Sequence, residues 1–162
     1  MVFVAATAND VERLPPELSR RGRFDEIFFV DLPTKSVRAE ILRIHLARKE
    51  RDPDEFDLAA LAEQSVGYSG AELEESIRDG LAESWADGAR PLRTEDIGEA
   101  LRATFPLSQT MSDSIAELRE WARVRARLAS PETPEQLPSL PDRLPRLAQE
   151  TRRNPFIRRS RE

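Results

Sequence analysis

Several kinds of site are excluded by what the sequence lacks. None of the 162 residues is Cys and only one is His, so neither a disulfide framework nor a thiolate-bound metal centre can form. No apolar run approaches the roughly 20 residues that a membrane helix needs. The first residues also lack the charged region and cleavage site of a signal peptide. We therefore expect no membrane segment, and a cytoplasmic protein is the simplest interpretation.

The charge balance argues against general binding to nucleic acid. The chain carries 25 basic and 30 acidic residues, a net charge of -5, which repels a polyanion at long range. Basic residues gather only locally, and the last eleven residues contain five arginines. We interpret this terminus as solvated, and the alternative is a docking segment for an acidic partner or nucleic acid.

Two apolar runs near the N-terminus predict strands. "MVFVAATAND" is a run of β-forming residues that stops at a polar pair, and "EIFFVDLP" is a second run closed by Pro33. Continuous apolar runs of this length are typical of strands buried in a parallel sheet. Because two strands alone are marginal in water, we expect the chain to lack the N-terminal half of its sheet.

From Thr34 onward the apolar residues follow a helical period. We expect helices over residues 34–49, 57–65, 69–88 and 94–104, with Asp57 as a cap and Ser69 with Glu72 as a capping box. Four short helices joined by brief loops form a bundle. A fifth helix is expected over residues 112–129, and residues 131–162, rich in proline and charge, are expected to form a disordered tail.

Four stretches in this order resemble the second half of a AAA ATPase module: "VFVAATAND", "LPPELSRRGRFDEIFFVDLP", "ILRIHLARK" and "GYSGAELE". The resemblance covers residues 2 to about 105. "PLSQTMSDSIAELREWARVRARLAS" further resembles the C-terminal end of uncharacterised AAA ATPases encoded in cyanobacterial and plastid genomes.

The resemblance implies a mostly α fold with four parts. Residues 1–33 would be a two-strand remnant of the parallel α/β P-loop ATPase sheet, and residues 34–105 a four-helix lid bundle. An extra C-terminal helix over 106–130 and the disordered tail over 131–162 would complete the chain.

The resemblance also assigns catalytic roles. Asn9 matches the sensor-1 position, which polarises the attacking water or the γ-phosphate, and it follows a strand end, where open α/β sheets place ligand groups. Arg20 and Arg23 match arginine fingers, which reach the ATP of a neighbouring protomer with a planar, permanently charged fork. Arg21 occupies a variable position and is interpreted as a surface charge.

Each of these residues also has a simple structural interpretation. Asn9 suits a turn. The arginines could belong to a solvated turn, where Asp25 and Glu26 are available to pair with them.

Three further residues match positions that contact the nucleotide. His45 would touch the base or ribose, while Gly70 and Ala71 would let the start of their helix approach the adenine. The alternatives are a packed core histidine and an ordinary helix start. No arginine is assigned as sensor 2, and no metal ligand is assigned.

The resemblance implies ATP and Mg²⁺ as cofactors and neighbouring protomers of a ring, expected to be a hexamer, as partners, together with an unknown protein substrate. However, no G-x-x-x-x-G-K-[ST] loop and no apolar strand ending in paired acids occurs in the sequence. The chain alone is therefore expected not to hydrolyse ATP. The competing interpretation is a non-catalytic helical interaction module with vestigial nucleotide residues.

Overall fold

The computed structural model of the chain describes residues 2–8, 11 and 25–130. Its strands are β1 (Phe28–Phe29) and β2 (Arg127–Leu128), and its longer helices are α1 (Lys35–Arg48), α3 (Gly70–Ala86), α4 (Thr94–Ala103) and α6 (Ser112–Arg125). Shorter turns of helix are η1 (Pro53–Glu55), α2 (Leu58–Gln64) and α5 (Leu107–Thr110). The fold is mostly α with two parallel strands, as predicted, although only β1 lies within a stretch that the sequence predicts as a strand.

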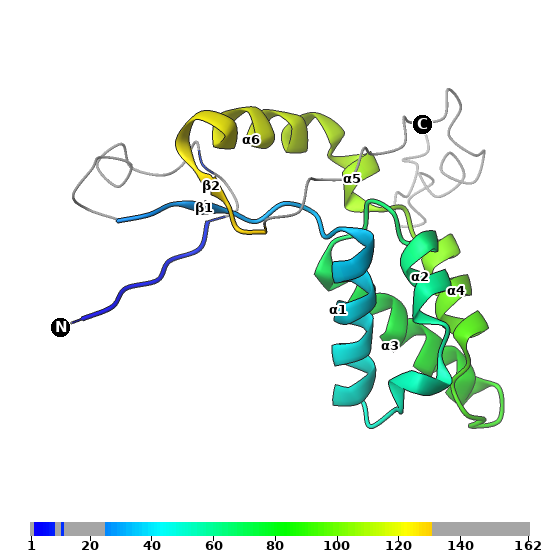
Figure 1. Cartoon of the computed structure of the whole chain (residues 1–162). Helices are drawn as coiled ribbons and strands as arrows, with labels where there is room; N and C mark the ends of the chain where they lie inside the picture. The colour runs from blue at the N-terminus through cyan, green and yellow to red at the C-terminus, as the bar shows by residue number, and fades with distance from the viewer. Residues whose placement is uncertain (1, 9–10, 12–24, 131–162) are drawn as a thin grey trace, which may run out of the picture.

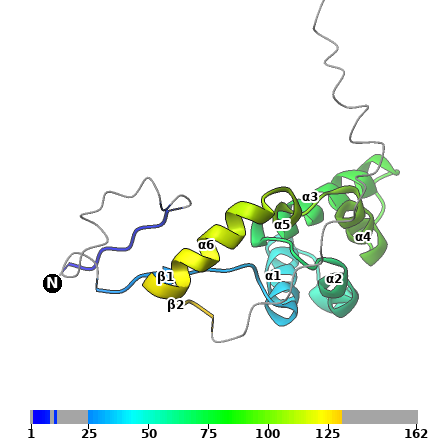
Figure 2. The same ribbon diagram turned by 90° about the horizontal axis from the view of Figure 1, so that it is seen from above.

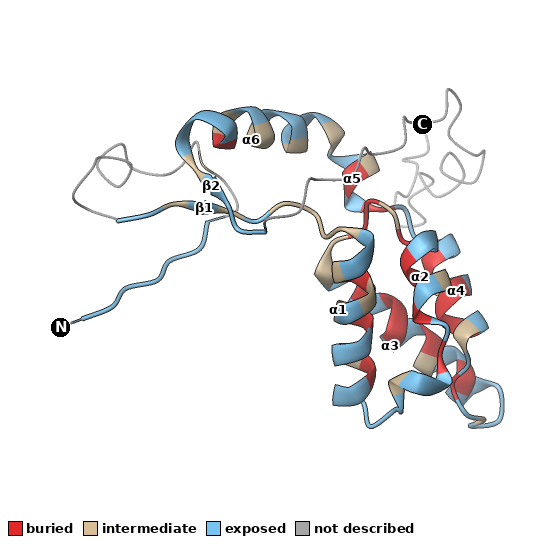
Figure 3. Cartoon of the chain, in the orientation of Figure 1, coloured by how far each residue is buried: buried red, intermediate tan, exposed pale blue. Residues whose placement is uncertain are grey.

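Helices α1 to α4 form a bundle around one apolar core (Figures 1 and 3). Most of the core side chains recur at helical spacing, which places them on one face of each helix, and Phe56, Tyr68 and Leu92 join them from the connections between helices. The members of the core are Leu42, Leu46, Phe56, Leu58, Leu61, Tyr68, Leu73, Ile77, Leu92, Ile97 and Leu101. The four helices that the sequence predicts are thus confirmed.

The helix starts show why these boundaries could be read from the sequence. The Asp57 carboxylate accepts a hydrogen bond from Ala60 N at 2.9 Å. The Ser69–Glu72 box closes in both directions, with Ser69 N donating to Glu72 Oε2 at 2.8 Å and Glu72 N donating to Ser69 Oγ at 3.4 Å. Side-chain acceptors satisfy backbone donors that the first turn of a helix leaves without partners.

The expected first strand is wrong in this structure. Residues 2–8 form no strand, and Val2 and Phe3 are 88% and 93% exposed. Instead β1 pairs in parallel with β2, with Phe28 opposite Arg127 and Phe29 opposite Leu128. A strand forms only where a neighbour supplies the hydrogen bonds, and residues 2–8 have no such neighbour among the described residues.

The expected fifth helix is correspondingly shorter than predicted. It ends at Arg125 instead of 129, and the chain then extends so that Arg127 N donates to Ile27 O and Ala129 N donates to Phe29 O, both at 2.9 Å. The tail predicted over 131–162 lies outside the described residues. Among the described residues, no helix has the length and apolarity that crossing a bilayer requires.

Residues 106–130, which we call the C-terminal arm, leave the bundle after α4 and return to β1. Both views place α6 alongside the segment that joins β1 to α1 (Figures 1 and 2). The arm begins with α5, a helix that the sequence pattern does not predict, and Leu107 N of α5 donates to Glu72 Oε1 at 2.7 Å. The arm therefore starts on the bundle and ends on the strand pair.

Candidate functional site: a pocket between the linker and the bundle

The three predicted catalytic residues, Asn9, Arg20 and Arg23, lie outside the described residues. The predicted base-contacting residues His45, Gly70 and Ala71 are described, and they lie on α1 and at the start of α3. The site can therefore be built from its bundle side.

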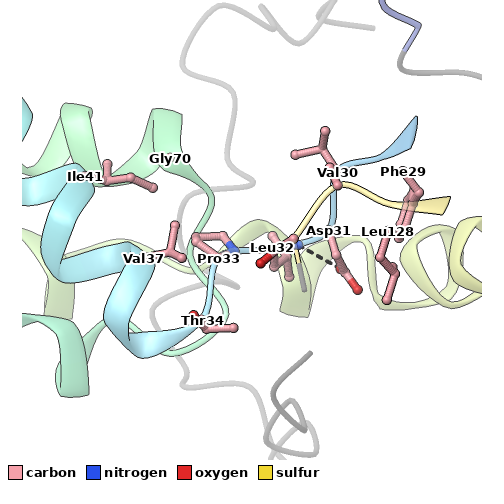
Figure 4. A pocket seen from close by; sticks show the side chains of 12 residues that line it. Phe29, Val30, Asp31, Leu32, Pro33, Thr34, Val37, Ile41, Gly70 and Leu128 are labelled. Atoms are coloured by element: carbon pink, nitrogen blue, oxygen red, sulfur yellow. Dashed lines mark hydrogen bonds between the residues drawn. The ribbon is translucent and has the colours of Figure 1, made fainter. Parts of the chain in front are cut away.

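A pocket of about 340 Å³ opens next to Gly70 (Figure 4). It lies between residues 30–34, which we call the linker, the first half of α1, the start of α3 and the end of β2. The side chains of Val37 and Ile41 project into it from α1, and Leu128 of β2 lies beside Phe29 at the other end of the lining. Small-molecule sites in proteins commonly have volumes of about 300–1,000 Å³, so the pocket is large enough for a ligand of modest size.

The lining of the pocket combines apolar side chains with a lack of basic ones. Its side chains are mainly apolar, with Val30, Leu32, Pro33, Val37 and Ile41 prominent, and none of the described residues that line it is Lys, Arg or His. Such a surface suits a flat, weakly polar group that uses backbone donors and acceptors for orientation. It offers no cation for a phosphate and no cluster of carboxylates for a metal ion. Among the described residues, no group of three or more His, Asp or Glu could hold a metal.

Gly70 and its neighbour Ala71 differ in their relation to the pocket. Gly70 lines it, and a Cβ added at Gly70 would lie 3.6 Å from Ile41 Cδ1, an ordinary contact distance. Ala71 is exposed and does not line the pocket. The fold itself therefore leaves room for a methyl group at Gly70, so a requirement for glycine there would come from a ligand.

His45 lies one turn beyond Ile41 on α1 and is not part of the lining. Its side chain is 15% exposed, and Nδ1 is 3.5 Å from Glu74 Oε1. This nitrogen is buried and has no hydrogen-bond partner among the described residues. Because buried polar atoms usually have partners, an Nδ1 without one among the described residues is available to a ligand. The nucleotide contact of His45 therefore stays a prediction.

Arg38 fixes the linker against the bundle, a role that the sequence analysis missed. It is 1% exposed, and its guanidinium donates to Pro33 O from Nη1 at 2.9 Å. It also donates to Ala62 O from Nε at 3.0 Å and from Nη2 at 2.8 Å. The planar fork of an arginine suits this double anchoring, and its charge lies near the C-terminal end of α2, where a cation is favoured. Only its position amid the apolar residues of α1 could have signalled this role.

Asp31 fixes the other side of the linker. Arg119 Nε lies 3.0 and 2.9 Å from the two Asp31 carboxylate oxygens, and Arg119 Nη2 donates to Oδ1 at 2.9 Å. The Asp31 side chain is 11% exposed and that of Arg119 is 29% exposed. No local pattern joins two residues 88 positions apart, so the sequence could not reveal this pair.

The "GYSGAELE" segment, residues 67–74, connects helices next to the pocket. Tyr68 Oη lies 2.5 Å from Leu101 O and 2.6 Å from Thr104 O, which ties the end of α4 to the start of α3. Burial and, to a smaller extent, the Glu72 carboxylate raise the pKa of the Tyr68 hydroxyl. Glu72 both caps α3 and accepts from Leu107 N of the arm. The segment therefore joins three helices at the rim of the pocket.

Comparisons with known proteins show what the chain is similar to. No family model matches the chain. It is 42% identical over 131 residues to the "Uncharacterized AAA domain-containing protein ycf46" of Guillardia theta, an alignment covering 80% of this chain and 26% of that protein. The protein of the same name from Trieres chinensis is 44% identical over 133 residues, covering 80% and 26%. The chain is a relative of the AAA ATPases.

The AAA relationship extends to proteins with other names and to a solved structure. The "ATP-dependent zinc metalloprotease FtsH" of Acidothermus cellulolyticus is 42% identical over 95 residues, covering 59% of this chain and 14% of that protein. The crystal structure of the FIGL-1 AAA domain in complex with ADP has a TM-score of 0.55 at 20% identity, covering 72% of this chain and 42% of that one, and it shows the shared fold. The chain spans about a quarter of the length of the ycf46 relatives that it matches.

Proposed function

We propose that the chain is the C-terminal portion of a AAA ATPase that couples ATP binding and hydrolysis in an oligomeric ring to the remodelling of a protein partner. The observation that carries this proposal is the apolar pocket beside Gly70, between the linker and the bundle, in a chain related to AAA ATPases. In this proposal the pocket receives the base of the nucleotide, and α1 to α4 act as the lid. We further propose a cytoplasmic protein and a ring of six subunits.

The described residues fit the base and no other part of ATP. The pocket wall is mainly apolar, and its polar lining residues are Asp31, Thr34 and Ser130. The triphosphate of ATP and the Mg²⁺ whose charge phosphoryl transfer requires would both have to be held by protein groups outside this pocket. The 162 residues contain no phosphate-binding loop, so those groups need residues from elsewhere in the assembly. We therefore expect weak base binding and no turnover by the chain alone.

Asn9, Arg20 and Arg23 are proposed to act on the phosphate side. Asn9 would orient the attacking water through its amide, which both donates and accepts hydrogen bonds. Arg20 and Arg23 would reach a neighbour's γ-phosphate, where guanidinium groups stabilise the charge of the transition state. Arg21 has no proposed role and therefore serves as their matched control.

The pocket assignment can be tested on the chain as it stands. We expect ADP and adenosine to shift the amide resonances of the linker, Val37, Ile41 and Gly70, because the base alone makes the contacts. Val37→Trp fills the pocket and should abolish these shifts. Ile44→Trp, on the same helix but outside the pocket and 42% exposed, should leave them intact. Unchanged resonances at saturating ADP in the unmodified chain would contradict the assignment.

The arginine assignment is tested in an assembly that turns over ATP, formed when the chain is extended upstream through a phosphate-binding loop. We expect Arg20→Ala and Arg23→Ala to reduce turnover about 10³-fold or more while nucleotide binding stays near that of the unmodified protein. Arg21→Ala should retain turnover. A loss of binding as large as the loss of turnover would show that these arginines hold the subunit's own nucleotide or its fold.

One observation favours a second candidate, a non-catalytic helical interaction module. Tyr68, Ser69 and Glu72, which belong to the family-like "GYSGAELE" segment, already have structural partners within the chain. A segment of this kind could persist for its structural work alone. A stable monomer that neither binds ADP nor gains turnover when extended would support this candidate.

A further inference from the structure

The C-terminal arm is attached to the rest of the molecule at three places. At its start, Leu107 N donates to Glu72 Oε1 at 2.7 Å. In its middle, the Arg119 guanidinium donates to the Asp31 carboxylate. Its end is held by the two backbone hydrogen bonds that β2 makes with β1. The first attachment is on the bundle and the other two are on β1 and the linker, so the arm runs alongside the segment that joins β1 to α1 (Figure 2).

The end of the arm also forms one wall of the pocket. Leu128, Ala129 and Ser130 line the pocket opposite the bundle residues Val37 and Ile41. Ala129 N donates to Phe29 O, and Phe29 is itself a lining residue (Figure 4). The strand pairing that docks the arm is thus the same contact that completes the pocket.

The Arg119–Asp31 pair acts on the pocket from a second direction. Asp31 lines the pocket, and its Oδ1 also accepts from Leu32 N at 2.7 Å. Arg119 thereby fixes a carboxylate that in turn fixes the linker backbone. Its three short hydrogen bonds are charge-assisted, the strongest class that a protein surface offers. Arg119 is a positioning residue, because it does not itself line the pocket.

The arm is docked with little burial. Ala122 is the only residue of α6 that is buried, and both residues of β2 are exposed. Val124 is 75% exposed and Leu128 is 51% exposed. Segments with few buried apolar contacts open at low free energy, so the modest binding energy of a small ligand is sufficient to shift this docking equilibrium.

We propose that the C-terminal arm is a closing element of the base pocket, so that binding of an adenine nucleotide and docking of the arm on the linker stabilise one another, with Arg119 as the residue that couples them. The inference rests on the proposed function, because it takes the pocket as the base site. Thermodynamic linkage makes the effect reciprocal: the factor by which the ligand favours docking equals the factor by which docking favours the ligand.

The test measures both sides of this linkage on the full 162-residue chain. Hydrogen exchange of the Arg127 and Ala129 amides reports arm docking, because these amides bond to β1. We expect saturating ADP to slow their exchange about tenfold, within the usual range of coupling factors. Arg119→Gln should weaken ADP binding by a similar factor and should remove the ADP-dependent slowing. Arg119→Lys keeps the charge and should fall between the two.

The matched control is Arg123→Gln. Arg123 lies one turn further along the same helix, is 75% exposed and pairs only with the exposed Glu120 among the described residues. The Arg123→Gln chain should bind ADP, and ADP should slow the exchange of its Arg127 and Ala129 amides, as in the unmodified chain. A melting temperature of Arg119→Gln equal to that of the control shows that the bundle is intact, so that any loss of affinity comes from the arm.

The outcomes separate the two proposals. If ADP shifts the pocket resonances but Arg119→Gln binds it as tightly as the unmodified chain, the arm is no closing element and the base site stands. Unchanged exchange of the Arg127 and Ala129 amides at saturating ADP leads to the same conclusion. If ADP shifts no pocket resonance in the unmodified chain, the base site fails and the arm proposal fails with it.

Discussion

Replacement of Arg38 by methionine tests whether the linker is anchored as the structure shows. Methionine fills a similar volume but has no donor, so Pro33 O and Ala62 O lose the guanidinium. Ala62 O also lies 3.3 Å from the Ser65 hydroxyl, but the single proton of that hydroxyl is shared with the nearer Leu61 O at 2.8 Å. The full loss therefore falls on Pro33 O and a partial loss on Ala62 O.

The magnitude follows from these two losses. Hydrogen bonds from a charged donor contribute about 1.5–3 kcal/mol each, so one full and one partial loss amount to about 3 kcal/mol. Methionine also removes a charge that is 1% exposed, and relief of that desolvation opposes the loss. We expect Arg38→Met to lower the free energy of unfolding by about 2 kcal/mol, which for a bundle of this size lowers the melting temperature by about 10 °C.

Urea denaturation followed by circular dichroism measures this change. Arg43→Met is the matched control on the same helix, because Arg43 is 47% exposed and its ion pairs within the described part of the chain are surface contacts with Glu40 and Asp54, which contribute about 0–1 kcal/mol. An Arg38→Met chain as stable as the unmodified one would refute the reasoning. It would show that the cost of burying the guanidinium equals the gain from its hydrogen bonds.

Four further substitutions test the packing and electrostatics of the bundle. A Cβ at Gly80 would lie 3.2 Å from the backbone atom Ile97 N, whereas a Cβ at Gly98 would chiefly meet the movable end of the Gln64 side chain at 3.1 Å. Calorimetry should therefore show that Gly80→Ala lowers the free energy of unfolding by about 1–2 kcal/mol. Gly98→Ala should leave it unchanged or raise it. Tyr68→Phe loses the contacts with the end of α4 and should cost about 1 kcal/mol in the same assay. The Arg90 guanidinium, which grips Asp96 at 2.7 and 2.8 Å, holds the pKa of that carboxyl below its ordinary value, against the opposing effect of burial. A lowered folded pKa gives stability that is present above the ordinary carboxyl pKa and lost as the pH falls through the lowered value, so Asp96→Asn should flatten the acid limb of an unfolding-against-pH curve.

The helices of the bundle could be predicted because their signals are local. Asp57 and the Ser69–Glu72 box lie within one turn of the groups that they cap, and the apolar residues of each helix repeat at its own period. One contact at the start of α4 is not local. Thr94 begins α4 but does not cap it, and its hydroxyl instead accepts from Asp57 N at 3.1 Å. That bond joins two helix starts 37 residues apart, beyond the reach of a local pattern.

The strands and the arm could not be predicted in the same way. "ARLAS" continues the composition of α6, yet residues 127 and 128 leave the helix because β1 offers two backbone acceptors at that point. The apolar residues 2–8 have every local property of a strand but no neighbour among the described residues. Pairing between distant segments is decided by which edges are available. The sequence shows composition and period, and neither specifies a partner.

Of the described residues predicted to contact the nucleotide, Gly70 lines the pocket, whereas His45 and Ala71 do not. Gly70 came from a resemblance, while the opposite wall at residues 128–130 came from the strand pairing. The partners of Tyr68, Ser69 and Glu72 are all within the chain, so their presence would be required even without a nucleotide. Gly70 is different, since a methyl group there would make only an ordinary contact with Ile41. Gly70→Ala should therefore leave the unfolding free energy within about 0.5 kcal/mol of the original, and a fall of about tenfold in ADP affinity, the effect of one misplaced methyl group in a fitted site, would have to come from the ligand.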